Sequence, residues 1–156
     1  MELSLQIIRT LSEYGILYKR YFHGPILTYE DAEREKAIHH WSWVESKNVF
    51  LTDKNGSYFL FVTVQWEKID FQKMKELTGK KISIASREDV TLYSWCVPWC
   101  VAPLLFDESI KTIVDSKIFQ HEKYLFSPGV STETLEIDPK WLRKVFESQK
   151  NIIFIG

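Results

Sequence analysis

Lys47 is the residue of this sequence whose position first suggests chemistry. It stands directly before Asn48 and an apolar run, Val49–Leu51, that is predicted as a strand. An ammonium group there is a compact positive charge that could hold a phosphate or polarise a carbonyl oxygen. Most lysines are solvated, so on residue type alone an exposed Lys47 without a chemical role is favoured.

Cysteine and histidine are the candidate metal ligands of this sequence. Cys96 and Cys100 are four residues apart, and a secreted disulfide framework would carry more cysteines. The four histidines lie elsewhere in the sequence and complete no metal-ligand spacing with the cysteines. The sequence therefore predicts two reduced thiols near the core rather than a metal site. The histidines are His23, His39, His40 and His121.

Composition bounds the class of protein. Hydrophobic residues make up 45% and charged residues 26% of 156 residues, which predicts one globular domain over residues 1–156. A net charge of −1 provides no global basic field, so we expect no DNA partner and only a small local surface for any RNA. The start of the chain lacks a signal-peptide pattern, and no apolar run is as long as a membrane span. We therefore expect a cytoplasmic protein without a membrane partner.

A hairpin is the clearest local pattern. Residues 46–53 read as a strand, and Asn55-Gly56 is a strong turn signal because both residues tolerate a positive φ. Residues 57–64 are apolar almost throughout, so the return strand is predicted to be buried on both faces. This places Lys47 at the mouth of the first strand of a central hairpin.

Periodicity and capping residues predict the other elements. Strands and helices alternate irregularly, which favours an α+β class with a mixed sheet and helices packed on it. Thr28, Asp70, Ser86 and Asp138 are the predicted helix N-caps. Helices are predicted over 3–14, 29–38, 70–77 and 86–93 and from Pro139 onwards. Further strands are predicted over 16–22, 81–85, 110–115, 124–126, 134–137 and 152–155.

Several short motifs follow one another in a distinctive order. A strand ending near His23 leads to a helix capped by Thr28, and later segments add three more motifs. These are Lys47-Asn48-Val49-Phe50-Leu51, Val101-Ala102-Pro103, and Pro128 with Thr132 and Thr134. In this order and spacing, over about 130 residues, the chain resembles the YbaK/ProX family of aminoacyl-tRNA deacylases.

The resemblance implies a fold and a reaction. It implies a curved, mixed, largely antiparallel sheet with helices packed around it. Family members hydrolyse the ester between a wrong amino acid and the 3′ end of a tRNA, as free proteins or as a domain inserted in prolyl-tRNA synthetase. Such editing exists because binding alone separates similar small amino acids poorly. The expected partner is the acceptor end of a mischarged tRNA. An aminoacyl-tRNA synthetase is left open as a second partner, and no cofactor is implied.

The resemblance also implies roles for individual residues. Lys47 would hold the terminal nucleotide, and backbone amides around Cys100 and Val101 would stabilise the oxyanion. On residue type, His23 at a strand end is more readily explained by local hydrogen bonds, and Asp115 by a structural role. The expected substrate-binding residues are His23, Thr28, Trp99, Ala102, Pro103, Ser127 and Thr132. Trp41, Trp43, Trp66 and Trp95 could stack on a base, although tryptophan more often fills the core.

Two departures from the family leave two functions open. Where the family has a glycine four residues before the signature proline, this chain has Trp99, and where many members have histidine it has Ser127. The bulk of Trp99 could fill part of the pocket or block close backbone approach. The chain is therefore either an active, divergent deacylase or a member that has lost hydrolysis and binds a tRNA end, a synthetase or a small ligand.

Overall fold

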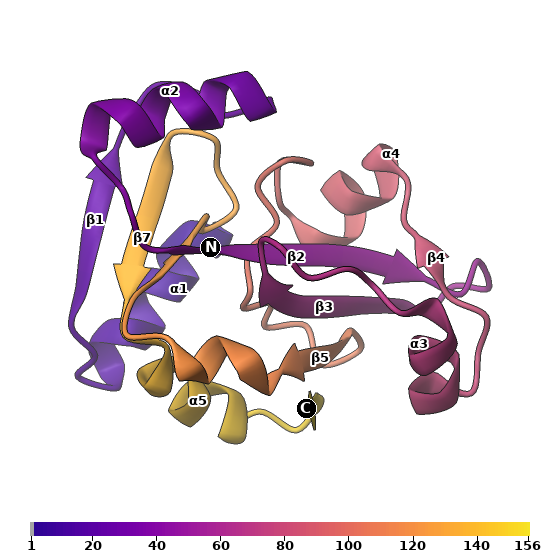
Figure 1. Cartoon of the computed structure of the whole chain (residues 1–156). Coiled ribbons are helices and arrows are strands. Elements are labelled where there is room, and N and C mark those ends of the chain that lie inside the picture. The colour runs from indigo at the N-terminus through magenta and orange to yellow at the C-terminus, as the bar shows by residue number, and fades with distance from the viewer. Residues whose placement is uncertain (1) are drawn as a thin grey trace.

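The computed structural model describes residues 2–156, and its strands form one mixed sheet with helices on both faces (Figure 1). The strands are β1 (Tyr18–Phe22), β2 (Val44–Thr52), β3 (Tyr58–Val64), β4 (Ser83–Ile84), β5 (Lys111–Asp115), β6 (Tyr124–Phe126), β7 (Glu133–Ile137) and β8 (Ile152–Ile155). The α-helices are α1 (Leu3–Glu13), α2 (Tyr29–His39), α3 (Phe71–Thr78), α4 (Arg87–Asp89) and α5 (Pro139–Glu147). A π-helical turn, η1 (Val90–Ser94), follows α4, and a 3-10 helical turn, η2 (Ser116–Gln120), follows β5.

The sheet runs in the order β1-β7-β6-β2-β3-β5-β8, with β4 also paired to β2. The pairs β1–β7, β6–β7, β2–β3 and β2–β4 are antiparallel, whereas β2–β6, β3–β5 and β5–β8 are parallel. Figure 1 shows β1 and β7 running in a different direction from β2, β3 and β5, so the sheet turns along its width. The predicted α+β class with a mixed, largely antiparallel sheet is confirmed.

Strand β2 shares one of its edges between two partners. Val44 and Glu45 pair with β6, and Leu51 and Thr52 pair with β4. Residues 46–49 between these contacts have no strand partner on that edge. The sheet therefore has a gap along the middle of β2.

The core lies on both faces of the central strands. Leu60 and Val62 of β3 pack in the larger cluster, which α1 and α5 cover. Phe59 and Phe61 point to the other face, where they join Met74 of α3. This alternation follows from the period-2 geometry of a strand. It confirms that β3 is buried on both faces, as its apolar sequence predicts.

The hairpin turn differs from the predicted one. Positive φ values occur at Lys54 (63°) and Gly56 (91°), whereas Asn55 has none. The Asp53 carboxylate accepts the N–H groups of Asn55 (2.8 Å) and Ser57 (3.0 Å) and so shapes a longer loop. The predicted hairpin is confirmed, but a positive φ occurs at Lys54 in place of Asn55, because a side-chain acceptor before the turn sets its geometry.

The predicted caps are confirmed, and some element bounds change. Thr28, Asp70, Ser86 and Asp138 accept backbone N–H groups in the first turns of α2, α3, α4 and α5. The predicted helix over 86–93 divides into α4 and the turn η1, and the predicted strand over 81–85 is only β4. Within the described chain, no helix combines the length and apolarity needed to cross a bilayer.

Strand β2 begins earlier than predicted, and this changes the position of Lys47 within the strand. The strand starts at Val44 because its first residues pair with β6, which lies far away in sequence. Lys47 therefore lies inside the strand, and its expected place at the strand mouth was wrong.

Asp53 should make stability depend on acid pH. The N–H of Asn55, then that of Ser57 and the Lys80 ammonium, lower the pKa of Asp53 to about 2. An unfolded Asp has a pKa of about 3.9, so the stabilisation is present above that pH and is lost as the pH falls towards 2. We expect Asp53→Asn to lower stability at pH 7 and to flatten the decline between pH 4 and 2. Urea unfolding across this range measures both effects.

The control for this variant is Glu88→Gln, which neutralises an exposed carboxylate on α4. It should leave the pH profile unchanged. A profile of Asp53→Asn that runs parallel to wild type would contradict the assignment.

Candidate functional site

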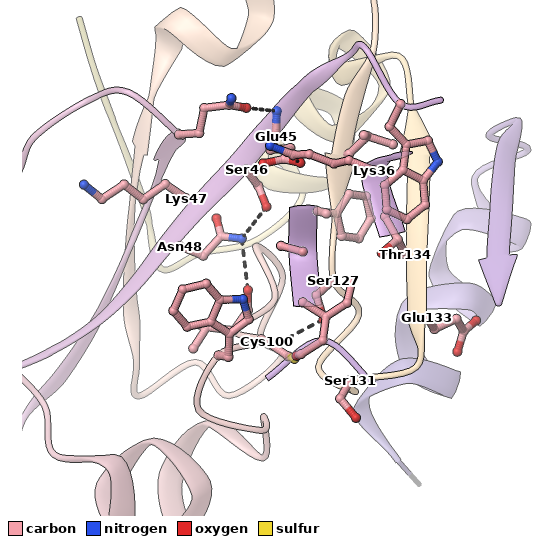
Figure 2. Close-up of a pocket in the computed structure, with 18 of the residues that line it drawn as sticks. Lys36, Glu45, Ser46, Lys47, Asn48, Cys100, Ser127, Ser131, Glu133 and Thr134 are labelled. Carbon is pink, nitrogen blue, oxygen red and sulfur yellow. Dashed lines mark hydrogen bonds and ion pairs between the residues drawn. The ribbon is translucent and has the colours of Figure 1, made fainter. Parts of the chain in front are cut away.

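A cavity of about 710 Å³ opens beside the gap in β2 (Figure 2). Its walls come from β2, the loop after η1, the segment between β6 and β7, and the start of α2. The wall is largely apolar on the side of Ile26, Phe126 and Val130, and polar near β2. The polar and charged lining residues are His23, Glu33, Lys36, Glu45, Ser46, Lys47, Asn48, Gln65, Ser127, Ser131, Glu133 and Thr134.

Hydrogen bonds fix the loop that carries Cys100 and Val101. From one side, Asn48 Nδ2 donates to the Val101 carbonyl oxygen (3.0 Å) and to Ser46 Oγ (3.1 Å). From the other side, Ser127 Oγ lies 3.3 Å from the Cys100 carbonyl oxygen and 3.1 Å from the Val130 carbonyl oxygen, and its single proton can be donated to either. Figure 2 shows these bonds crossing the cavity wall from β2 and from the segment after β6. A segment without regular secondary structure is thereby held in one geometry.

The backbone amides of this loop differ in what they contact. The Cys100 N–H donates to the Val97 carbonyl at 2.7 Å, and the Ala102 N–H donates to Cys96 Sγ at 3.5 Å. Within the described chain, the Val101 N–H makes no such bond. Among the Cys100, Val101 and Ala102 amides of the described chain, that of Val101 is therefore the one without a hydrogen-bond acceptor.

Lys47 lines the cavity, but its ammonium group is directed elsewhere. Nζ donates to the Glu67 carbonyl oxygen at 2.6 Å, and Figure 2 shows the side chain pointing away from Cys100 and Ser127. Neighbouring residues of a strand face opposite sides, so Asn48 points at the loop while Lys47 does not. Lys47 and the loop thus border one cavity without direct contact between the ammonium and the thiol.

Lys36 of α2 is a second cation in the wall and was not predicted from the sequence. It pairs with Glu33 and Glu45 at 3.2 Å each. Burial alone would disfavour its charge, but Glu45 and Glu33 outweigh burial and raise the pKa of Lys36. Its sequence context, a charged and largely solvated helix, gave no signal that it faces a cavity.

His23 is held by hydrogen bonds at both ring nitrogens. Nδ1 lies 2.7 Å from the Gly24 carbonyl, and Nε2 lies 2.8 Å from Thr134 Oγ1. A carbonyl only accepts, so Nδ1 carries a proton that it donates to Gly24, whereas the Thr134 hydroxyl can either donate to or accept from Nε2. The expectation that local hydrogen bonds hold His23 is confirmed, and the ring also lines the cavity.

The other predicted site residues fall into two groups. Trp99, Cys100, Val101 and Ser127 line the cavity, and Trp99 is 53% exposed and leaves the space open. The remaining four are not part of the lining. Thr28 caps α2, and Ala102 and Pro103 are buried. Thr132 is exposed, and its carbonyl oxygen accepts the backbone N–H of His23.

Asp115 has the structural role expected for it. Its carboxylate accepts the Thr63 hydroxyl at 2.8 Å in the core and the Lys117 N–H at 3.0 Å at the start of η2. Residues 2–156 contain no group of three or more His, Cys, Asp or Glu side chains arranged to hold a metal ion.

Residues 23–145 match the family model of the aminoacyl-tRNA editing domain. This match spans most of the sequence, and the chain belongs to that family. The resemblance to the YbaK-type deacylases, drawn from motif order, is confirmed. No curated protein matches the chain.

Known structures share the fold. The crystal structure of the hypothetical protein APE2540 has a TM-score of 0.77 at 19% identity, over 96% of this chain and 97% of that chain. The structure of a candidate trans-editing enzyme for prolyl tRNA synthetase has a TM-score of 0.71 at 14% identity, over 99% and 96%. A candidate signal transduction protein from Marinobacter aquaeolei VT8 has a TM-score of 0.65 at 11% identity, over 99% of this chain and 30% of that chain. These identities support the fold rather than a shared reaction.

Cys100 should be a poor nucleophile. Burial raises the pKa of its thiol to about 11, and the thiol donates to the Ile26 carbonyl at 3.4 Å. The thiolate is the reactive form, so little of it exists at neutral pH. We expect alkylation of Cys100 by iodoacetamide to increase up to about pH 11 in the folded protein, measured by mass spectrometry.

The same measurement in urea provides the control, because an unfolded thiol titrates near 8.5. A folded-state profile that levels off at pH 8 to 9 would contradict the assignment, whatever the absolute rate.

Proposed function

We propose that this protein is a divergent trans-editing deacylase, a hydrolase that cleaves the ester of a mischarged tRNA. The observations that carry the proposal are the open cavity lined by Val101 and the unpaired N–H of this residue within the described chain, in a member of the aminoacyl-tRNA editing family. The acceptor end of the tRNA is the proposed ligand, and a synthetase is a further candidate partner. A cytoplasmic location goes with this proposal.

In the proposed reaction, water attacks the ester carbonyl carbon, and the bond to the ribose oxygen then breaks. The Val101 N–H would donate to the oxyanion, a contribution of about 3–4 kcal/mol for one such donor in known hydrolases. Cys100 remains a neutral thiol, and Nε2 of His23 is engaged by Thr134. We therefore assign removal of the water proton to groups of the substrate itself. The products are the free amino acid and the tRNA hydroxyl.

The second candidate is a binding module that has lost hydrolysis. Trp99 favours it, because a large side chain stands where the family carries glycine. Its half-exposed position favours hydrolysis, since the indole leaves the cavity unfilled. Such a module would bind a tRNA end, a synthetase or a small ligand without turnover.

A deacylation screen separates the two candidates. The protein is incubated with a panel of tRNAs carrying wrong amino acids, and loss of the labelled amino acid is followed over time. Hydrolysis of at least one member above the uncatalysed rate supports the deacylase. Binding of tRNA without hydrolysis of any member would replace it with the binding module.

Lys47→Ala should impair hydrolysis without unfolding the protein. A charge-assisted contact to the nucleotide is worth enough to lower kcat/KM about 10- to 100-fold when it is removed. The matched control is Lys68→Ala, which removes an exposed lysine just beyond Glu67. Unchanged hydrolysis in Lys47→Ala, with normal thermal melting, would remove Lys47 from the mechanism.

Trp99→Gly should widen the cavity and raise or broaden activity. The indole lines the space, so its loss gives bulkier aminoacyl groups access. We expect a several-fold higher kcat/KM or hydrolysis of additional aminoacyl-tRNAs in the same screen. Trp95→Gly is the control, because Trp95 is 77% exposed and is not among the lining residues. A folded Trp99→Gly variant with wild-type rates and range would show that Trp99 is a bystander.

A further inference from the structure

The turn after β3 presents an indole at the cavity. The Glu67 N–H donates to the Val64 carbonyl at 3.0 Å and closes the turn. Gln65 ties it to β2, because the Gln65 N–H donates to the Glu45 carbonyl (3.0 Å) and Gln65 Oε1 accepts the Glu45 N–H (2.6 Å). Trp66 stands between these fixed residues, lines the cavity and is 57% exposed.

One neighbour fixes the Trp66 ring while much of its surface stays open. The His121 ring, at the end of η2, lies 5.6 Å away at 73° in an edge-to-face contact. A single exposed tryptophan needs no explanation. An indole that is held in orientation beside a cavity has the properties of a platform on which a nucleobase stacks.

Two ammonium groups from separate elements contact Glu67, the residue that follows this indole in the turn. Lys47 of β2 donates to the Glu67 carbonyl at 2.6 Å, and Lys117 of η2 pairs with Glu67 Oε1 at 3.2 Å. The Lys117 side chain is half exposed, so its remaining N–H groups can reach a ligand. Two lysines and one glutamate give this spot a local charge of +1, in a chain whose net charge is −1.

From these contacts we propose that the end of a single-stranded RNA binds at this turn. Its terminal base stacks on Trp66, and Lys117 joins Lys47 in contacting the phosphate that precedes it. Aromatic stacking combined with cations along the backbone is how single strands are bound. The proposal rests on the proposed function, because it names how the same cavity holds the nucleotide of its substrate.

The test measures binding of a fluorescein-labelled single-stranded RNA that ends in cytidine-cytidine-adenosine, by fluorescence anisotropy. Trp66→Ala is expected to raise Kd about 5- to 100-fold, the range for loss of one stacked base. Trp66→Phe should recover part of this loss. Trp95→Ala removes a more exposed indole at another place and should leave Kd unchanged.

An RNA with an abasic 3′-terminal residue tests which base is stacked. Wild type should bind it as weakly as Trp66→Ala binds the complete RNA. Trp66→Ala should show little further loss, because the base and the indole act as a pair. Additive losses from the two changes would overturn stacking of the terminal base on Trp66.

Salt dependence tests the phosphate contact. Lys117→Ala should reduce the slope of log K against log salt by about 0.7, the value for one single-strand phosphate. Lys75→Ala removes an exposed lysine of α3 and serves as the control. An unchanged slope in Lys117→Ala would overturn the role of Lys117.

The deacylation assay separates this proposal from the proposed function. RNA binding through Trp66 by a protein that hydrolyses no aminoacyl-tRNA would overturn the function and support the site. Hydrolysis with unchanged KM and Kd in Trp66→Ala would support the function and overturn the site. A wild-type protein that does not bind the RNA at all would overturn the site as well.

Discussion

The hydrogen bond from Asn48 to the Val101 carbonyl is the contact on which the geometry of the cavity depends. At 3.0 Å, this bond joins strand β2 to a loop that forms no backbone pairing with a strand. The bond has an energetic cost in the same side chain, because Asn48 Oδ1 is buried without a hydrogen-bond donor. Leaving a buried acceptor unpaired costs about 1–3 kcal/mol, so the loop is fixed at the expense of that oxygen. With the carbonyl of Val101 directed at Asn48, the orientation of the neighbouring peptide groups is restricted as well.

The titratable groups around the cavity are already engaged with one another. Lys36 is paired with two glutamates, His23 is hydrogen-bonded to Thr134, and burial raises the pKa of the Cys100 thiol. Such a site offers a ligand oriented dipoles and a defined position. This arrangement fits ester hydrolysis, which needs less activation of the leaving group than amide hydrolysis, and it fits simple binding as well.

Local signals in the sequence predicted the elements well. Thr28, Asp70 and Asp138 are caps whose acceptors lie within three residues of the donors, so short-range chemistry decides them. The site depended on longer-range pairing. The start of β2 was misplaced because β6, about 80 residues away, extends it, and this hid the direction of Lys47. Ala102 and Pro103 belong to the predicted motif, but their side chains are buried and do not line the cavity. Their burial depends on packing against Cys96 and its neighbours, which the motif alone does not reveal.

The gap along β2 determines how the cavity entrance responds to substitutions of the residues around it. Residues 46–49 cover about 14 Å of strand at the usual rise, between the ends of β6 and β4. The length of this gap is determined by where the two backbone ladders stop. Trimming or enlarging individual lining residues should therefore reshape the interior while the entrance persists. Closing the entrance would require β6 or β4 to extend its pairing along β2 into the gap.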